Sequence, residues 1–281
     1  MREKIKFVCD SLADIDETFA RKNEIIILPT FYYFNENELH SDKNKMDYKI
    51  FYERLENERA YSSCINLSDT EEIFRELINE GNKIIYFAFS SKLSTCYQVG
   101  NMIKDELDEN GDNIYVIDTL LATYPISLMI EKAISMYKLD EDLKTILKTI
   151  EEEKNKYNLV FTTNELDYLI RGGRLSPTMG MVGNILNIKP ILTFKDGEII
   201  AMNKVRGQNK AFKEIMNTIK EKNIDENNLV VIYAYDEVML NTLINSLKNE
   251  LNLVPKHIAR LNPTIGCHIG PSGCGIAYVE K

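Results

Sequence analysis

Two glycine-rich segments, far apart in the sequence, carry the side chains best suited to bind an anion. The first, Leu169-Ile-Arg-Gly-Gly-Arg-Leu-Ser-Pro177, places Arg174 directly after two glycines. Glycine permits a sharp turn at the end of one helix, and Ser176 and Pro177 suit the N-cap and first position of the next. A guanidinium in such a turn can bind a carboxylate or a phosphate. The alternative is a solvated arginine at a helix–helix corner.

The second segment, Ile265-Gly-Cys-His-Ile-Gly-Pro-Ser-Gly-Cys-Gly275, contains one of only three histidines in the chain. Its four glycines allow the backbone to approach a ligand closely. The imidazole of His268 can donate a hydrogen bond to an anion, or it can titrate near neutral pH. The alternative is a tight turn between two late strands, in which the histidine has no special role.

Serine hydroxyls add neutral hydrogen-bond donors to this set. Ser62 and Ser63 are adjacent in the sequence, and Ser94 lies in a polar loop that follows an apolar run. Arg174 and His268 would supply stronger donors beside them. Gathered on one surface, these five side chains suit a cradle for a carboxylate better than a reactive centre.

An enzymatic alternative remains open. Ser94 as nucleophile and His268 as base could serve a hydrolase or an acyl transferase, although no acid that would orient the histidine is evident. The sequence contains no G-x-S-x-G elbow, P-loop, dinucleotide-binding glycine motif or H-E-x-x-H motif. A zinc site from Cys267, His268 and Cys274 lacks a fourth ligand at standard spacing, so no metal is predicted. A third interpretation, an interaction module without a ligand, predicts no sizeable apolar cavity.

The helix predicted after Pro177 is apolar on nearly every side. Residues 179–186 include two methionines and two glycines. A buried core helix would explain this composition. Methionine side chains are adaptable, however, and a groove of small residues beside them would suit an acyl chain.

Composition limits the class of protein. The chain has 281 residues, 44% hydrophobic and 27% charged, and its net charge of -9 argues against nucleic-acid binding. The best candidate for a membrane span is the apolar run Tyr115–Met129. Asp118 and Pro125 interrupt it, so no stable membrane insertion is expected. The N-terminal residues resemble a first strand rather than a secretory signal. Five cysteines without a C-x-x-C pair predict a reduced, cytoplasmic protein.

The first half of the chain alternates strands and helices. Short aliphatic runs predict strands that are buried on both faces, and apolar residues at helical spacing follow them. This alternation predicts a mainly parallel sheet, with polar loops at the carboxyl ends of its strands, where ligands collect. The expected strands are Ile5–Cys9, Ile25–Leu28, Ile84–Phe89 and Ile114–Ile117, and the expected helices are Val99–Leu107, Leu121–Tyr137 and Asp140–Lys154.

The second half predicts an α+β domain with a mixed sheet. Lys195-Asp-Gly197 indicates a β-hairpin, because Asp-Gly supplies the turn geometry that hairpins require. The domains are expected to comprise residues 1–157 and 158–281, joined after the lysine-rich helix that ends at Lys156. Further strands are expected at Leu159–Thr162, Pro190–Phe194, Glu198–Met202, Leu229–Ala234, His257–Ala259, Thr264–His268 and Ile276–Val279, and helices at Ala211–Ile219 and Leu240–Leu251.

A series of short motifs, in this order over essentially the whole length, resembles the DegV family of fatty-acid-binding proteins that serve bacterial fatty acid kinase. The motifs are Asp10-Ser-Leu-Ala-Asp14, Ser90-Ser-Lys-Leu-Ser-Thr-Cys-Tyr-Gln98, Asp118-Thr119, Leu166-Asp-Tyr-Leu-Ile-Arg-Gly-Gly-Arg174, Ile188-Lys-Pro-Ile191, Asp196-Gly197, Lys204-Val-Arg206 and His268-Ile-Gly-Pro271.

The resemblance implies two α/β domains with one long-chain fatty acid between them, its tail in an apolar tunnel. By position, the carboxylate ligands would be Ser62, Ser94, Arg174 and His268, with Ser63 beside them. The basic residue implicated in docking the kinase falls at Arg206. The ATP-binding kinase subunit would make an acyl phosphate for phospholipid synthesis. This chain would then be a carrier that presents its substrate, without a cofactor, rather than an enzyme.

Three segments depart from the family pattern. Ser62-Ser-Cys-Ile-Asn66 replaces the usual Thr-Ser-Gln-Pro-Ser, and Thr95 replaces the glycine that follows the binding serine. Ala122-Thr-Tyr-Pro125 stands where glycines are usual. These changes retain the carboxylate donors and alter the loops around them.

Overall fold

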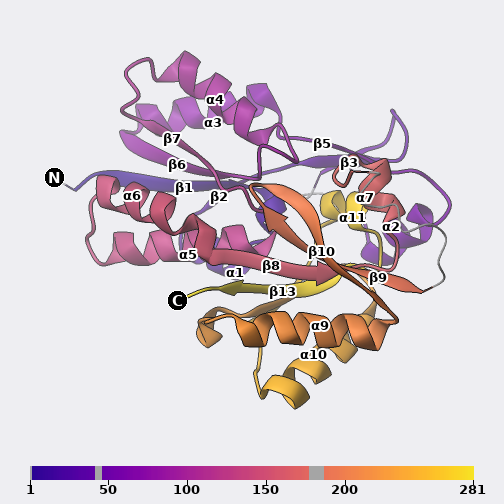
Figure 1. Cartoon of the computed structure of the whole chain (residues 1–281). Coiled ribbons are helices and arrows are strands. Elements are labelled where there is room, and N and C mark those ends of the chain that lie inside the picture. The colour runs from indigo at the N-terminus through magenta and orange to yellow at the C-terminus, as the bar shows by residue number, and fades with distance from the viewer. Residues whose placement is uncertain (1, 42–45, 177–186) are drawn as a thin grey trace.

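The computed structural model describes residues 2–41, 46–176 and 187–281 (Figure 1). Within these residues the chain forms three β-sheets, which we call sheets A, B and C. The strands of sheets A and B lie between residues 4 and 118, and those of sheet C between residues 157 and 279. Short 3₁₀ turns, η1 (Ser11–Ala13), η2 (Lys154–Lys156) and η3 (Glu226–Asn228), join some of the elements.

Sheet A is a four-stranded parallel sheet in the order β2-β1-β6-β7. Phe7 pairs with Ile85, and Ile85 pairs with Tyr115. Ile84 and Ile85 are completely buried, as their aliphatic run predicts. The predicted parallel sheet is therefore confirmed. Its strands are β1 (Lys4–Asp10), β2 (Ile26–Leu28), β6 (Asn82–Ala88) and β7 (Ile114–Asp118).

Helices cover both faces of sheet A (Figure 1). One face packs against α3 (Leu67–Asn79) and α4 (Cys96–Leu107). On the other face, α5 (Tyr124–Lys138) also contacts β8 and β13 of sheet C. Because α5 lies between two sheets, it is buried on several sides and lacks a broad polar face. The remaining helices of this half are α1 (Glu17–Lys22) and α6 (Leu143–Glu153).

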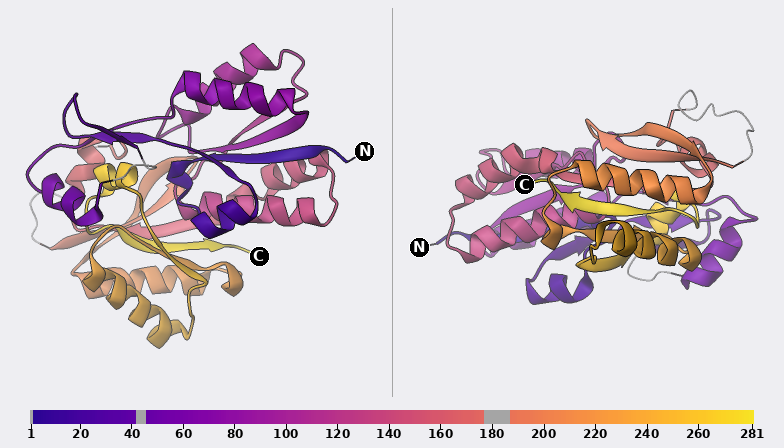
Figure 2. Two further views of the ribbon diagram at one scale, coloured as in Figure 1. Left: turned by 180° about the vertical axis from the view of Figure 1, so that it is seen from behind. Right: turned by 60° about the horizontal axis from the view of Figure 1, so that its bottom comes forward.

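Sheet C is a six-stranded mixed sheet in the order β10-β9-β8-β13-β11-β12. Its neighbouring strands are antiparallel except for β11 and β12. Helices α9 (Gln208–Glu221) and α10 (Glu237–Leu251) cover the face that points away from α5 (Figure 2). Its strands are β8 (Tyr157–Thr162), β9 (Ile188–Lys195), β10 (Glu198–Arg206), β11 (Val230–Tyr233), β12 (His257–Arg260) and β13 (Cys274–Val279).

The predicted hairpin joins β9 to β10. Asp196 and Gly197 have φ angles of 51° and 84°, as a type I′ turn requires. The second strand continues to Arg206, four residues beyond the predicted end at Met202. The hairpin prediction is confirmed, but both strands are longer than predicted, because β9 (Ile188–Lys195) also extends beyond the predicted Pro190–Phe194.

Sheet B consists of short strands in the order β4-β3-β5, none of which was predicted from the sequence. Each strand has three residues, too few to show a period-two pattern. Helix α2 (Tyr48–Leu55) lies between β4 and β5 in the sequence. The strands are β3 (Phe31–Tyr33), β4 (Leu39–Ser41) and β5 (Tyr61–Ser63).

One predicted strand is wrong. Residues 264–268 belong to a helix, α11 (Pro263–Ile269), and not to a strand. Asn262 is its N-cap, since the side-chain Oδ1 accepts a hydrogen bond from the amide of Ile265 at 2.9 Å. Pro263 occupies the first helical position, where its missing amide hydrogen costs nothing. These local signals outweigh the β-branched residues that suggested a strand.

Helix α11 lies in the C-terminal half of the sequence but packs against elements of the first half. It contacts α2, β3 and β5, as well as the short helix α7 (Asp167–Arg171) (Figure 2). The Nδ2 of Asn262 donates to Asp14 Oδ1 at 2.9 Å and to the carbonyl of Ser11 at 2.8 Å. The division into residues 1–157 and 158–281 stays a prediction, and α11 bridges the two parts.

None of the helices in the described ranges combines the length and the apolar character that a bilayer crossing needs. In the same part of the chain, no three His, Cys, Asp or Glu side chains are grouped to hold a metal ion.

Candidate functional site

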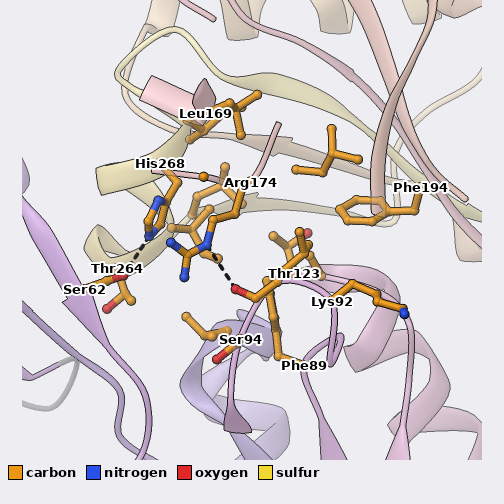
Figure 3. A pocket seen from close by; sticks show the side chains of 18 of the residues that line it. Ser62, Phe89, Lys92, Ser94, Thr123, Leu169, Arg174, Phe194, Thr264 and His268 are labelled. Atoms are coloured by element: carbon orange, nitrogen blue, oxygen red, sulfur yellow. Dashed lines mark hydrogen bonds between the residues drawn. The ribbon is translucent and has the colours of Figure 1, made fainter. Parts of the chain in front are cut away.

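A cavity of about 540 Å³ lies where the loops after β6 and β7 meet β5, α11 and sheet C. The five side chains predicted to bind a carboxylate, Ser62, Ser63, Ser94, Arg174 and His268, all line it. In Figure 3, Ser62, Ser94, Arg174 and His268 gather on one side, and Phe194 and Lys92 lie on the other. Most of the remaining wall is apolar and includes Phe89, Phe161, Ile199, Ile232 and Leu261.

The closest contact within this set joins His268 of α11 to Ser62 of β5. Nε2 of His268 lies 2.7 Å from the hydroxyl oxygen of Ser62. Burial, with a smaller effect from the guanidinium of Arg174, lowers the pKa of His268 to about 3. The imidazole is therefore neutral near pH 7. With its proton on Nε2 it donates to Ser62, and the Ser62 hydroxyl can then donate to a ligand.

The glycines before Arg174 are required for two different reasons. Gly173 has a φ of 72°, a left-handed conformation that glycine adopts without strain. Gly172 has an ordinary φ of -75°, but a Cβ at this position would collide with Nδ1 of His268. This nitrogen has no hydrogen-bond partner in the described structure. The predicted turn is confirmed, and Gly172 also makes room for the histidine ring.

Arg174 enters the cavity, and within the described ranges no carboxylate pairs with its charge. Its Nε donates to the carbonyl of Leu93 at 3.0 Å, and its Nη1 donates to the carbonyl of Gly172. Burial lowers the pKa of the guanidinium, which nevertheless remains charged at neutral pH. No ion pair of Arg174 occurs among the residues that the structure describes. A half-buried cation of this kind favours an anionic ligand.

The two other serines have different surroundings. Ser94 donates from its hydroxyl to Sγ of Cys96 at 3.1 Å and accepts from the Cys96 amide at 3.3 Å. Ser63 is exposed at the rim, because successive side chains of a strand point to opposite faces. His268 therefore contacts Ser62 and not Ser63. It is not hydrogen-bonded to Ser94 either, so the geometry does not form the nucleophile–base pair of the enzymatic alternative.

Arg206 lies apart from this group. It is exposed at the end of β10, and it does not line the cavity. The methionine-rich segment 179–186, predicted to be a helix beside an acyl chain, lies outside the described residues.

The β9–β10 hairpin closes one wall of the cavity. Phe194 and Ile199, on either side of its turn, both line the cavity. At the tip, the carbonyl of Gly197 accepts a buried hydrogen bond from the hydroxyl of Ser90 at 2.7 Å. In the sequence, Ser90 was identified only as the first residue of a family motif, with no role of its own. No local signal could have identified its partner, which is 107 residues away in the sequence.

Thr264 also lines the polar part of the cavity, and it was not among the predicted site residues. Its hydroxyl accepts from Thr30 Oγ1 at 3.2 Å. Asn262 and Pro263 could have indicated a helix in which Thr264 and His268, four residues apart, share a face.

Comparisons with known proteins agree over nearly the full length. The family model described as "Uncharacterised protein, DegV family" matches residues 4–281. The DegV domain-containing protein TTE1491 of Caldanaerobacter subterraneus subsp. tengcongensis is 32% identical and covers 99% of this chain and 100% of its own length. The fatty acid-binding protein of Thermotoga maritima is 29% identical, with 99% of each chain covered.

The three-dimensional comparison gives the same result. The crystal structure of DegV, a fatty acid binding protein from Bacillus subtilis, matches with a TM-score of 0.85 and 26% identity. The match covers 99% of this chain and 100% of that chain. Sequence and fold agree, and the chain therefore belongs to the DegV family.

Proposed function

We propose that this protein binds a long-chain fatty acid in the cavity of about 540 Å³. The carboxylate would bind Ser62, Ser94, Arg174 and His268, with Ser63 at the rim, and the tail would lie along the apolar wall. One observation carries the proposal: the half-buried charge of Arg174 has no carboxylate partner in the described structure and faces a largely apolar cavity.

The expected binding energetics agree with a long-chain fatty acid as the ligand. Each methylene removed from water contributes about 0.8 kcal/mol, so the tail would dominate the binding free energy. The carboxylate must then accept hydrogen bonds from the protein, because burying it without donors costs several kcal/mol. Arg174 offers charge-assisted donors, and Ser62 adds a neutral one through its contact with His268. These groups bind and hold the acid without a cofactor.

The proposal extends to the role that the family resemblance implies. The protein would present the carboxylate to an ATP-dependent fatty acid kinase, and the acyl phosphate would serve phospholipid synthesis. Arg206 is available for docking the kinase because it is exposed and lies outside the cavity. The fatty acid would lie between the parts formed by residues 1–157 and 158–281. A cytoplasmic location is supported by the five cysteines, all of which are free thiols.

Two experiments test these proposals separately. Native mass spectrometry of the protein purified from a bacterial host should show one bound fatty acid, and R174Q should retain less of it. A wild-type protein that neither carries nor takes up fatty acid would contradict the binding function.

For the kinase step, R206A should reduce acyl phosphate formation with a fatty acid kinase while fatty acid binding is unchanged. R21A, at another exposed arginine, is the matched control; equal activity of R206A and R21A would exclude docking by Arg206.

A further inference from the structure

A second, smaller pocket of about 120 Å³ lies against the polar end of the main cavity. The two share Ser62, Arg174 and His268, so these side chains separate one space from the other. The outer wall of the small pocket includes Arg59 and Arg171. The groups proposed to hold the fatty acid carboxylate therefore face a second space.

This outer pocket is strongly cationic. Arg59 lies over the ring of Tyr61, 4.9 Å from its centroid, and Arg171 lies 4.7 Å from the ring centroid of Tyr168. These contacts position two flexible side chains and leave guanidinium hydrogens at the edges available. With Arg174, the pocket has three guanidinium groups.

The two outer arginines have no carboxylate within ion-pair distance in the described ranges, although Glu165 and Glu56 are close enough to Tyr168 to raise the pKa of its hydroxyl. In the described ranges, neither Arg59 nor Arg171 forms an ion pair with a carboxylate; the arginines that do are Arg2, Arg54, Arg75 and Arg260. The only side-chain hydrogen bond between the pair runs from Arg59 Nη2 to the backbone carbonyl of Arg171, at 3.3 Å. The planar guanidinium group of arginine matches the geometry of phosphate oxygens. Several such cations together suit a doubly charged phosphoryl group better than they suit a singly charged carboxylate.

The size of the pocket agrees with this chemistry. At about 120 Å³, the outer pocket has less than a quarter of the volume of the main cavity of about 540 Å³, so it suits a small polar group such as a phosphoryl group rather than a second acyl chain. We propose that the outer pocket binds a phosphoryl group attached to the head of an acyl chain whose tail occupies the main cavity. This inference rests on the proposed fatty acid binding, and it assigns Arg59 and Arg171 to the phosphorylated form alone.

The test compares two ligands with equal tails by calorimetry. The first is palmitate. The second is 2-oxoheptadecylphosphonate, in which a methylene replaces the bridging oxygen of palmitoyl phosphate. In the R59Q/R171Q double variant, affinity for the phosphonate should fall roughly tenfold or more, because two charge-assisted interactions are lost. Affinity for palmitate should stay within about twofold of the wild type, which also shows that the variant is folded. R21Q, at an exposed arginine outside both pockets, should leave both affinities unchanged.

The outcomes separate this inference from the proposed function. Wild-type protein that binds palmitate but not the phosphonate would overturn the inference and leave the fatty acid function intact. Equal losses for both ligands in R59Q/R171Q, or no loss for either, would also overturn it. Binding of neither ligand by the wild type would contradict the proposed function itself, and the inference with it.

Inorganic phosphate, titrated into palmitate-loaded protein, distinguishes a free from a tethered phosphoryl group. Weak binding that R59Q/R171Q removes would support the outer pocket as a phosphate site. Stronger binding of free phosphate than of the phosphonate would overturn its assignment to a phosphoryl group on the acyl chain.

Discussion

Nε2 of His268 lies 2.7 Å from the hydroxyl oxygen of Ser62, although 206 residues separate them in the sequence. The contact exists because α11 packs against β5, and because Asn262, the N-cap of α11, donates hydrogen bonds to the carbonyl of Ser11 and to Asp14 Oδ1. The polar end of the cavity is therefore completed only when the last part of the chain docks onto the first.

His268 should be uncharged at neutral pH in the ligand-free protein. Its pKa is lowered to about 3 from 6.5, so the unfolded chain binds the proton more readily than the folded one. Its contribution to stability is complete above 6.5 and is lost as pH falls from there toward 3. Chemical denaturation of wild type and H268Q at several pH values should show a smaller acid loss in the variant. A His268 resonance that titrates near neutral pH would contradict this expectation.

Gly172 and Gly173 form a matched pair for testing the histidine position. G172A should displace the His268 ring and weaken fatty acid binding, because the new Cβ would overlap Nδ1. G173A should cost about 1 kcal/mol of stability from its left-handed φ of 72°, but it should leave the His268 ring in place because no described protein atom lies within 4 Å of the new Cβ. The fatty acid affinity and the free energy of unfolding, measured for G172A and G173A, test these expectations. Equal affinities in G172A and wild type would show that the ring position is unimportant.

Ser90 should hold the β9–β10 hairpin over the cavity. S90A removes the donor to the buried carbonyl of Gly197, and an unsatisfied buried acceptor costs about 1–3 kcal/mol. Bound fatty acid should also leave faster, because Phe194 and Ile199 on this hairpin line the cavity. Stopped-flow displacement and denaturation measure the two effects. S135A, at an exposed serine of α5 that lines neither pocket, is the control; a similar release rate in S90A and S135A would refute the role of Ser90.

Asp10 should make the protein less stable at alkaline than at acid pH. Burial raises the pKa of this carboxyl from 3.8 to about 6, although it accepts from the amide of Phe89 and the hydroxyl of Tyr86. The folded state binds the proton more tightly, so the stabilising contribution is complete below 3.8 and is lost as pH rises through 6. D10N should therefore be more stable than wild type near about pH 8, by up to about 3 kcal/mol, and similar near about pH 4. A destabilised D10N at alkaline pH would show that the hydrogen bonds of the carboxylate outweigh its burial.

Several features could be predicted from sequence because their signals are local. Buried aliphatic runs such as Ile84–Phe89 are typical of parallel strands, and Asp196-Gly197 has the backbone preferences of a hairpin turn. The glycines before Arg174 similarly indicate a helix end. The three-residue strands of sheet B carried no such signal, and α11 was mistaken for a strand.

The sequence by itself determined which groups could bind an acid: the types of Ser62, Arg174 and His268, and the turns that carry two of them. Only the tertiary structure decided that Ser62 rather than Ser63 meets the histidine and that Arg174 lacks a carboxylate partner in the described structure. It also produced the low pKa of His268. Backbone preference depends on neighbouring residues, whereas burial, charge balance and hydrogen-bond partners depend on segments that meet only in the folded chain.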